Sequence, residues 1–397
     1  MSRDPAGPLR VGLNFVFLRP GSGGAGRYAR ELPGALLANE PDSEIHVFLS
    51  REAPADLLAE PWADSVRFVR CPVDMNGGRA HLLFQFTVLP MLAAARRLDV
   101  LHSLANLGPA ITPGLASVVS LLDVIWMRPP SDWGGSASGQ RSLRRIVEHD
   151  TRHADQIFAI SEAGARDITR SLGVAGERIH VTPLGVRPPT AVPAQEQAVR
   201  AELELGSARV ILSVAQKHPY KNLQSLVRAL PDLDADVMLV LPGFSTAHEQ
   251  QLRELARELG VAERLRLPDW LSDSSLAGLY ALSSAFVLPS FVEGFGLPVL
   301  EAMLRDVPVA CSASSSLPEV AGDAALLFDP ERQEEITAAI RRLLDDRAYA
   351  ERLVERGRAR AAEFTWARTG ESSLAGYRRA IEHRQGRRRL RLPLASR

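Results

Sequence analysis

The sequence predicts an α/β protein of two domains, each built on a parallel sheet. Short runs of Val, Ile, Leu and Phe alternate along the chain with longer stretches in which apolar residues recur at helical spacing. Continuous apolar runs that alternate with helices are typical of buried parallel strands. At 397 residues the chain is long enough for two or three domains. A Pro-rich stretch without periodic pattern, residues 183–195, separates two series of such runs.

The apolar runs define the expected strands in order. In the first half, strands are expected at Val11–Phe17, Ile45–Leu49, Val66–Val69, Val100–His102, Ser117–Leu121, Ile157–Ile160 and His180–Pro183. In the second half, they are expected at Val210–Val214, Val237–Leu241, Leu265–Leu267, Ala285–Pro289, Val307–Cys311 and Ala325–Phe328. Helical patterns close the chain at 333–344, 346–361 and 366–382.

These patterns set the expected domain boundaries. We predict one domain over residues 1–188 and a second over 189–365, followed by a helix over 366–383. Residues 384–397 form a polar, basic tail. This tail either is solvated and frayed or contacts an anionic surface such as a membrane, where each Lys or Arg adds about 1 kcal/mol.

Composition excludes several classes of protein. Apolar residues make up 46% and charged residues 24%, which is globular rather than disordered. Lys and Arg number 47, as do Asp and Glu, and this zero balance argues against a nucleic-acid binder. Two isolated cysteines argue against a disulfide scaffold or a zinc site. The N-terminus lacks a signal-peptide core, and no apolar stretch is long enough to span a bilayer, so we expect a soluble, cytoplasmic protein.

A Gly-rich segment, Arg19–Gly26, follows the first expected strand and leads into a helix. Glycines allow a tight turn and a close approach of backbone to a ligand. The N-terminus of the following helix suits a phosphate. The glycine spacing is neither that of a dinucleotide-binding loop nor that of a Walker A loop. The segment is therefore either a phosphate or substrate loop or a structural turn.

The second half opens in a similar way. Strand Val210–Val214 leads to Lys221, and Asn222 is expected to cap the helix that follows. A cation beside a helix N-terminus is unfavourable unless both share an anion. Lys221 is thus a candidate phosphate ligand, and the alternative is a solvated loop lysine.

The most informative motif, Phe291–Glu301, follows the strand Ala285–Pro289. Its sequence places Glu293 in a loop and Glu301 early in a helix, with two glycines between them whose amides are accessible. Carboxylates bind vicinal hydroxyls through charge-assisted hydrogen bonds, so a sugar and a ribose are the natural ligands. The alternative is that Glu301 only stabilises the helix N-terminus and Glu293 is solvated.

Three other patterns contain residues that could bind a metal or a ligand. The Asp-x-Asp motifs in Asp232–Asp236 lie between a helix and a strand, at the end of the sheet opposite the expected binding edge. His149 and His153 share a helix face but have no evident third ligand. No metal site is therefore expected. His102 ends a strand and either faces a ligand or is a buried structural histidine.

The chain resembles glycosyltransferase family 4, whose members have the GT-B fold. The resemblance covers most of the sequence and includes a Glu-x7-Glu motif, Glu293 to Glu301. The matching segments are residues 23–32, Ala159–Glu162, Pro183–Val186, Lys221–Asn222, Leu288–Met303, Leu317–Ala325 and Phe364–Trp366. The resemblance implies two Rossmann-like domains whose parallel sheets face an interdomain cleft, with the last helix crossing back to the first domain.

The resemblance also implies roles for individual residues. Catalytic roles are implied for Glu293, Lys221 and Asp123. Contacts with the nucleotide-sugar donor are implied for Gly24, Gln216, Lys217, Lys221, Phe295, Gly296, Leu297 and Glu301. Acceptor-side positions are Gly26, Arg27 and His102.

Two positions depart from the family pattern. Many members have His-Asp where this chain has Leu122–Asp123, and that histidine normally contacts the donor sugar. Many have Arg where Gln216 stands, and Lys217 either supplies the missing charge or points elsewhere.

The implied function is a retaining hexosyltransferase that needs no metal or other cofactor. It would move a mannose-, rhamnose- or glucose-type hexose from a nucleoside-diphosphate sugar to a hydroxyl of a saccharide, lipid-linked or secondary-metabolite acceptor. Two alternatives are a silent nucleotide-sugar-binding homologue, suggested by Leu122, and a nucleotide-sugar epimerase.

Overall fold

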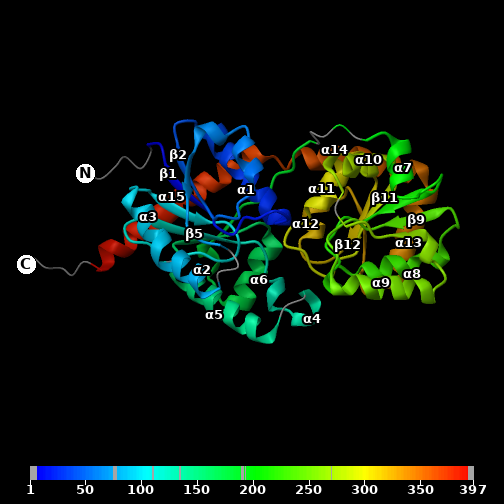
Figure 1. The fold of residues 1–397 in the computed structure, drawn as a ribbon, viewed down its shortest axis with the longest axis horizontal. Helices are drawn as coiled ribbons and strands as arrows, with labels where there is room; N and C mark the ends of the chain where they lie inside the picture. The colour runs from blue at the N-terminus through cyan, green and yellow to red at the C-terminus, as the bar shows by residue number, and fades with distance from the viewer. Residues whose placement is uncertain are drawn as a thin grey trace, which may run out of the picture. The chain divides into compact units, whose positions relative to one another are not determined.

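The computed structural model describes residues 7–391 apart from 75–77, 110, 134–135, 189–191, 193 and 270. It divides into two compact units (Figure 1). The first unit is Met1–Val124, Arg141–Gly185 and Thr365–Arg397, and the second is Ile125–Gln140 and Val186–Phe364. Each unit has its own parallel sheet with helices packed on it, which is the predicted α/β class.

The first unit contains a 7-stranded parallel sheet in the order β3-β2-β1-β4-β5-β6-β7. Its strands are β1 (Arg10–Phe15), β2 (Glu44–Leu49), β3 (Arg67–Arg70), β4 (Val100–Ser103), β5 (Ala116–Leu121), β6 (Gln156–Ala159) and β7 (Ile179–Val181). Its helices include α1 (Gly23–Asn39), α2 (Arg79–Leu83), α3 (Leu89–Ala95), α5 (Ala137–His153), α6 (Glu162–Leu172) and α15 (Trp366–Arg391). The central strands are almost completely buried, which explains their continuous apolar runs.

The second unit contains a 6-stranded parallel sheet in the order β10-β9-β8-β11-β12-β13. Its strands are β8 (Arg209–Leu212), β9 (Val237–Val240), β10 (Leu265–Arg266), β11 (Ser283–Leu288), β12 (Val309–Ser312) and β13 (Leu326–Phe328). Its helices are α4 (Pro130–Trp133), α7 (Glu196–Glu202), α8 (Leu223–Ala229), α9 (Ala247–Glu258), α10 (Asp273–Leu282), α11 (Leu297–Met303), α12 (Leu317–Ala321), α13 (Gln333–Asp345) and α14 (Arg347–Ala362).

The strand order of the second unit fixes where a ligand should bind. From β8 the chain proceeds to β9 and β10 on one side and returns to add β11 and β12 on the other. The carboxyl ends of β8 and β11 therefore meet at a topological switch point, where parallel sheets bind their ligands.

The last helix, α15, packs within the first unit, against α1 and the β4–β6 region of the sheet. It continues past the predicted end at residue 383. Arg384 and Arg387 place guanidinium nitrogens 3.1 and 3.8 Å from the buried carboxylate of Asp155, which explains why the first part of the basic tail is ordered as helix. Residues 392–397 of the tail lie outside the described residues.

The first unit does not contain all of the first domain that was predicted over residues 1–188. Residues 125–140 belong to the second unit, where α4 lies against the short helix Pro219–Lys221. The side chain of Gln140 stabilises this segment by donating to the carbonyls of Trp126 and Arg128, at 3.0 and 2.6 Å. Part of the predicted linker, residues 189–191 and 193, lies outside the described residues.

Among the described residues, none of the helices combines the length and the apolar character needed to cross a membrane.

Candidate functional site

Lys221 and Glu293 form the centre of the candidate site in the second unit. Lys221 ends the short helix that follows β8, and Glu293 lies in the loop that follows β11. The two loops are joined by a backbone hydrogen bond from Phe291 N–H to the Tyr220 carbonyl, 2.9 Å long. The Lys221 ammonium donates to both carboxylate oxygens of Glu293, at 2.8 and 2.9 Å. The two residues predicted from separate motifs are thus in direct contact.

The ion pair is partly exposed, and a neighbouring hydroxyl group orients its carboxylate. The side chains of Lys221 and Glu293 are 14% and 10% exposed. Ser290 donates its hydroxyl to Glu293 Oε1 at 2.6 Å and so orients the carboxylate. The site therefore presents a positive and a negative group side by side at the switch point, which suits a ligand with both an anionic and a hydroxylated part.

Glu301 lies in α11, in the same unit, and its side chain is directed mostly inward. The residue is 8% exposed, and the Tyr280 hydroxyl donates to its Oε2 at 3.3 Å. The guanidinium of Arg305 lies 4.7 Å from the centre of the Tyr280 ring and donates to the Glu301 carbonyl. Tyr280 thus orients the Glu301 carboxylate and is itself packed against Arg305, whereas the contact of Glu301 with a ribose remains a prediction.

The loop between the two glutamates turns its side chains inward. Phe295 is 4% exposed and packs edge-on against Phe364, and Leu297 is 8% exposed. Gly296 has φ 111°, and a Cβ there would lie 2.6 Å from Leu317 Cδ2, so glycine is required at this position. Phe295 and Leu297 therefore turn their side chains away from solvent, and the contact of their backbone amides and that of Gly296 with a donor stays a prediction.

The expectation that Lys217 supplies charge to the donor is wrong. Lys217 is fully buried, and its ammonium contacts Glu249 Oε2 at 3.1 Å and the carbonyls of Gly243 and Pro268. Burial alone would raise the pKa of Glu249, but hydrogen bonds from Arg253, Ser245 and Lys217 outweigh it and lower that pKa. Lys217 instead ties together the loops that follow β8, β9 and β10. Its neighbour Gln216 is exposed, and its donor contact stays a prediction.

The expectation that His102 faces an acceptor is also wrong. The residue is fully buried on β4, with its ring nitrogens 2.7 Å from the Tyr377 hydroxyl and 2.8 Å from the Ser120 hydroxyl. The Tyr28 hydroxyl lies 3.3 Å from the same Ser120 oxygen. Burial lowers the pKa of His102 to about 3, so the ring is neutral. His102 is a structural residue that links α15 to the sheet.

The predicted roles of the remaining candidates in the first unit stay predictions. Gly24 is exposed in the first turn of α1, whereas Gly26 is buried, with its Cβ position 3.0 Å from Ser22 Cβ. Arg27 is exposed, and Asp123 is half-buried just after β5.

The patterns set aside as metal sites have other roles in the structure. Asp234 and Asp236 pair with Arg209 at 2.7 and 3.0 Å. The rings of His149 and His153 stack with their centres 4.4 Å apart. In the part of the chain that the structure describes, no three His, Cys, Asp or Glu side chains gather closely enough to hold a metal ion.

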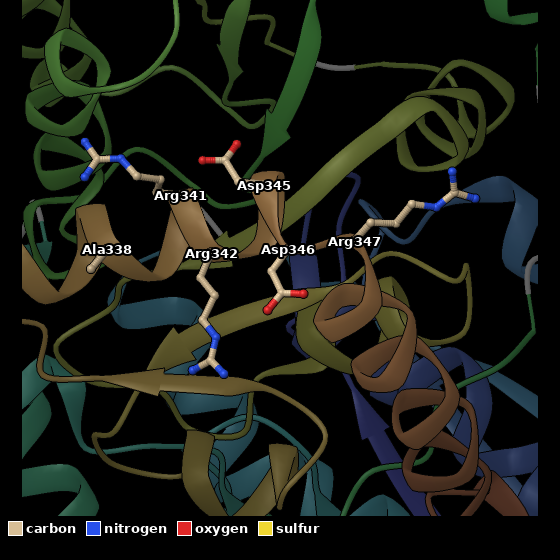
Figure 2. A pocket seen from close by; sticks show the side chains of 6 residues that line it. All are labelled: Ala338, Arg341, Arg342, Asp345, Asp346 and Arg347. Carbon is tan, nitrogen blue, oxygen red and sulfur yellow. The ribbon is translucent and has the colours of Figure 1, made fainter.

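A surface depression of about 510 Å³ lies where α13 meets α14 (Figure 2). It is lined by Ala338, Arg341, Arg342, Asp345, Asp346 and Arg347. Asp345 pairs with Arg209, the first residue of β8, so the depression lies at the amino end of that strand. Lys221 and Glu293 follow the carboxyl ends, and the depression is therefore separate from the candidate site.

Two residues that shape the candidate site were not predicted from the sequence. Ser290 contacts Glu293, and Tyr280 contacts Glu301. The spacing of Ser290, three residues before Glu293, was a usable signal. Asn222 was expected to cap α8 with its side chain, but that side chain donates to the Pro330 carbonyl, 2.9 Å away.

Comparison with known protein families gives two matches that together cover most of the chain. The model for Glycosyltransferase Family 4 matches residues 22–188, and the model for Glycosyl transferases group 1 matches residues 195–360. The division between the two matches falls near the boundary of the structural units.

Among curated proteins, the chain is 28% identical to an MMP alpha-(1->4)-mannosyltransferase of Mycolicibacterium hassiacum, over 94% of this chain and 98% of that protein. It is 30% identical to D-inositol 3-phosphate glycosyltransferase 1 of Catenulispora acidiphila, over 80% of this chain and 76% of that protein. Among solved structures, HepE of Anabaena in complex with UDP and glucose matches with a TM-score of 0.71 and 18% identity, over 92% of this chain and 98% of that one. The structural likeness shows the GT-B fold.

Proposed function

The chain belongs to glycosyltransferase family 4, and from this membership we propose that it is a retaining, metal-independent hexosyltransferase. It transfers a glycosyl group from a nucleotide sugar. The proposed sugar is a hexose of the mannose, rhamnose or glucose type, and the proposed acceptor is a hydroxyl of a saccharide, lipid-linked or secondary-metabolite molecule. The name of the mannosyltransferase relative supports a mannose-type donor.

The observation on which this proposal rests is the Lys221–Glu293 pair at the switch point of the second unit. In the proposed reaction the bond between the anomeric carbon and the diphosphate oxygen breaks. The Lys221 ammonium and the amides of residues 295–297 stabilise the negative charge that develops on the leaving diphosphate. Glu293 accepts hydrogen bonds from sugar hydroxyls, and Glu301 from the ribose.

The acceptor oxygen forms its new bond to the anomeric carbon on the face from which the diphosphate departs. Its proton passes to the departing phosphate oxygen, so the reaction needs no protein nucleophile. Attack on the same face retains the anomeric configuration.

Thermal unfolding with nucleotide sugars tests the donor site. The panel contains UDP-, GDP-, ADP- and dTDP-sugars, and the proteins are wild type, Glu301→Ala and the control Glu258→Ala on the exposed surface of α9. A ligand that binds only the folded state stabilises it by about 2.7 kcal/mol at 100 times its Kd. We expect one nucleotide family to raise the Tm of wild type and of the control but much less that of Glu301→Ala. No shift with any donor would contradict the proposal.

Two further measurements test the mechanism. NMR of the product made with a matching acceptor should show the anomeric configuration of the donor, and inversion would refute retention. The initial rate should be unchanged by excess EDTA, and a loss restored by Mg²⁺ or Mn²⁺ would refute metal independence. Donor binding without transfer to any acceptor would favour the silent homologue suggested by Leu122.

A further inference from the structure

An apolar stripe is exposed on the helical segment between β3 and β4. Helix α2, a π-helical turn at Phe84–Val88 and helix α3 follow one another without a break over residues 79–95. Three large apolar side chains of this segment are exposed, Leu83 by 65%, Val88 by 42% and Met91 by 61%. We call these three residues the apolar stripe. At the rise of a helix, the stripe extends over roughly 12 Å.

The opposite side of the same segment is packed into the first unit. Phe84, Leu89 and Ala93 belong to a buried apolar cluster that also contains residues of β2 and β4. Gln85 is 3% exposed and donates its side-chain amide to the Leu107 carbonyl at 3.1 Å. The apolar stripe is therefore the outward side of a firmly anchored helix, and its exposure does not come from loose packing.

The π-helical turn explains how the stripe comes to face outward. The Leu89 N–H donates to the carbonyl five residues back, and the following Pro90 has no N–H for an α-helical bond. The wider turn allows Leu83 and Val88, which are five residues apart, to share the exposed side. The exposed Thr87 donates its hydroxyl to the Leu83 carbonyl at 2.6 Å, so this hydroxyl adds no donor to the surface beside the stripe.

The charge around the apolar stripe has a single sign. Residues 75–98 contain no Asp or Glu, and their charged residues are the arginines at positions 79, 96 and 97. Arg97 is exposed just after the end of α3. A helix that lies in the interface of an anionic bilayer combines the same features, because apolar side chains enter the acyl boundary while arginines contact the headgroups.

This charge argues against a second copy of the chain as the partner of the stripe. In a two-fold dimer the same surface patch meets itself. The arginines of one copy would then approach those of the other, and residues 75–98 supply no carboxylate to neutralise them. An anionic bilayer supplies the negative charge and the apolar interior together.

We propose that the apolar stripe docks this protein on the surface of a membrane that contains anionic phospholipids. Leu83, Val88 and Met91 enter the boundary between the headgroups and the acyl chains. Arg97 contacts the lipid phosphates. The helix lies along the membrane surface and does not cross the bilayer.

The position of the stripe in the fold connects this docking to the choice of acceptor. The helical segment follows the carboxyl end of β3, and Gln85 binds the loop that follows β4. The segment therefore begins near the carboxyl edge of the first sheet, the edge at which parallel sheets bind their ligands. Docking at this place favours the lipid-linked acceptor among the three proposed classes. The choice of acceptor rests on the proposed function, whereas the docking does not.

Co-sedimentation of the full-length protein with lipid vesicles tests the docking. One set of vesicles is one third phosphatidylglycerol and two thirds phosphatidylcholine, and the other is phosphatidylcholine alone. The double variant Leu83→Gln/Met91→Gln removes the two most exposed members of the stripe and keeps residues that suit a helix. The matched control Leu259→Gln replaces a leucine that is 37% exposed at the end of α9 in the second unit.

We expect wild type and the control to bind the anionic vesicles roughly 10-fold more strongly than the neutral ones. The double variant should lose roughly 10-fold or more of its binding to the anionic vesicles. Arg97→Gln should lose about fivefold, because it removes one cation from the membrane surface. The Tm of every variant should stay close to that of wild type, since the replaced side chains are exposed.

Three outcomes would overturn the docking. The first is a wild type that does not bind the anionic vesicles. The second is equal binding by wild type and the double variant, which would place the contact elsewhere, as in the basic tail. The third is self-association of wild type in sedimentation velocity that the double variant loses, which would assign the stripe to a second copy. These measurements contain no nucleotide sugar, so failure of the donor panel would remove the choice of acceptor and leave the docking intact.

Discussion

The two units place polar side chains near the carboxyl ends of central strands, but with opposite results. In the first unit, His102 and Ser120 lie on β4 and β5 and are enclosed together with Tyr377. In the second unit, Lys221 and Glu293 follow β8 and β11 and keep 14% and 10% of their side-chain surface exposed. The first group makes hydrogen bonds that hold the fold, whereas the second is available to a ligand.

The difference arises from what covers each position. Tyr377 belongs to α15 and lies 275 residues from His102 in sequence, so a distant segment closes over the histidine. In the second unit, Lys221 and Glu293 are each other's charged partner. A polar residue at a strand end is therefore a candidate for ligand binding only when no later segment packs over it.

The largest expected effect is on turnover. Lys221→Met should lower kcat/KM for the nucleotide sugar by roughly 100- to 1000-fold, because the leaving diphosphate loses its cation. The initial rate at subsaturating donor measures this. The control is Arg341→Met in the depression between α13 and α14, which should keep the wild-type rate. Equal initial rates for the two variants would contradict a donor site at the carboxyl ends of β8 and β11.

The next effect is a pH dependence of stability in the first unit. Asp150 is fully buried, and its carboxylate oxygen lies 3.4 Å from the Gly108 amide. Burial raises the pKa of Asp150 from 3.8 to about 8. The folded state then retains the proton up to about pH 8 while the unfolded chain loses it near pH 4. The protonated Asp150 carboxyl therefore contributes most to stability below pH 4. Between pH 4 and pH 8 the free energy of unfolding that it contributes falls by up to about 1.4 kcal/mol per pH unit.

Asp150→Asn should remove this dependence. Its free energy of unfolding relative to wild type should increase from pH 5 to pH 8, as measured by urea denaturation at each pH. Asp155→Asn is unsuitable as the control because Asp155 pairs with Arg384, so the exposed Asp323→Asn serves instead. Parallel pH curves for wild type and Asp150→Asn would contradict the buried, protonated carboxyl.

The smallest effects concern the buried histidine. His102→Leu leaves the Tyr377 hydroxyl without its partner and should destabilise the fold by about 2 to 4 kcal/mol. Tyr377→Phe removes one hydroxyl and should cost about 1 to 2 kcal/mol. Urea denaturation gives both values, and KM for donor and acceptor should be unchanged. A raised acceptor KM at unchanged stability would restore His102 as an acceptor-side residue.

Local sequence pattern was sufficient to locate the strands and to single out the two residues that meet at the centre of the candidate site. The apolar runs located the strands of both sheets, and Lys221 and Glu293 each followed one of them. Lys217 could not be assigned in this way, because its burial depends on Glu249 and on two loops distant in sequence. The contacts of Ser314, Ser315 and Ser316 with the Glu293 loop could not be predicted either, because these serines follow β12 and their partners follow β11. Contacts between separate loops leave no periodic signal in the sequence.

The packing of α15 in the first unit has a consequence for how the molecule is made. Synthesis proceeds from the N-terminus, and residues 186–364 of the second unit emerge from the ribosome as one uninterrupted stretch. The sheet of the first unit emerges earlier but must wait for Tyr377 before His102 is enclosed. The half of the protein that is translated first is therefore the half that is completed last.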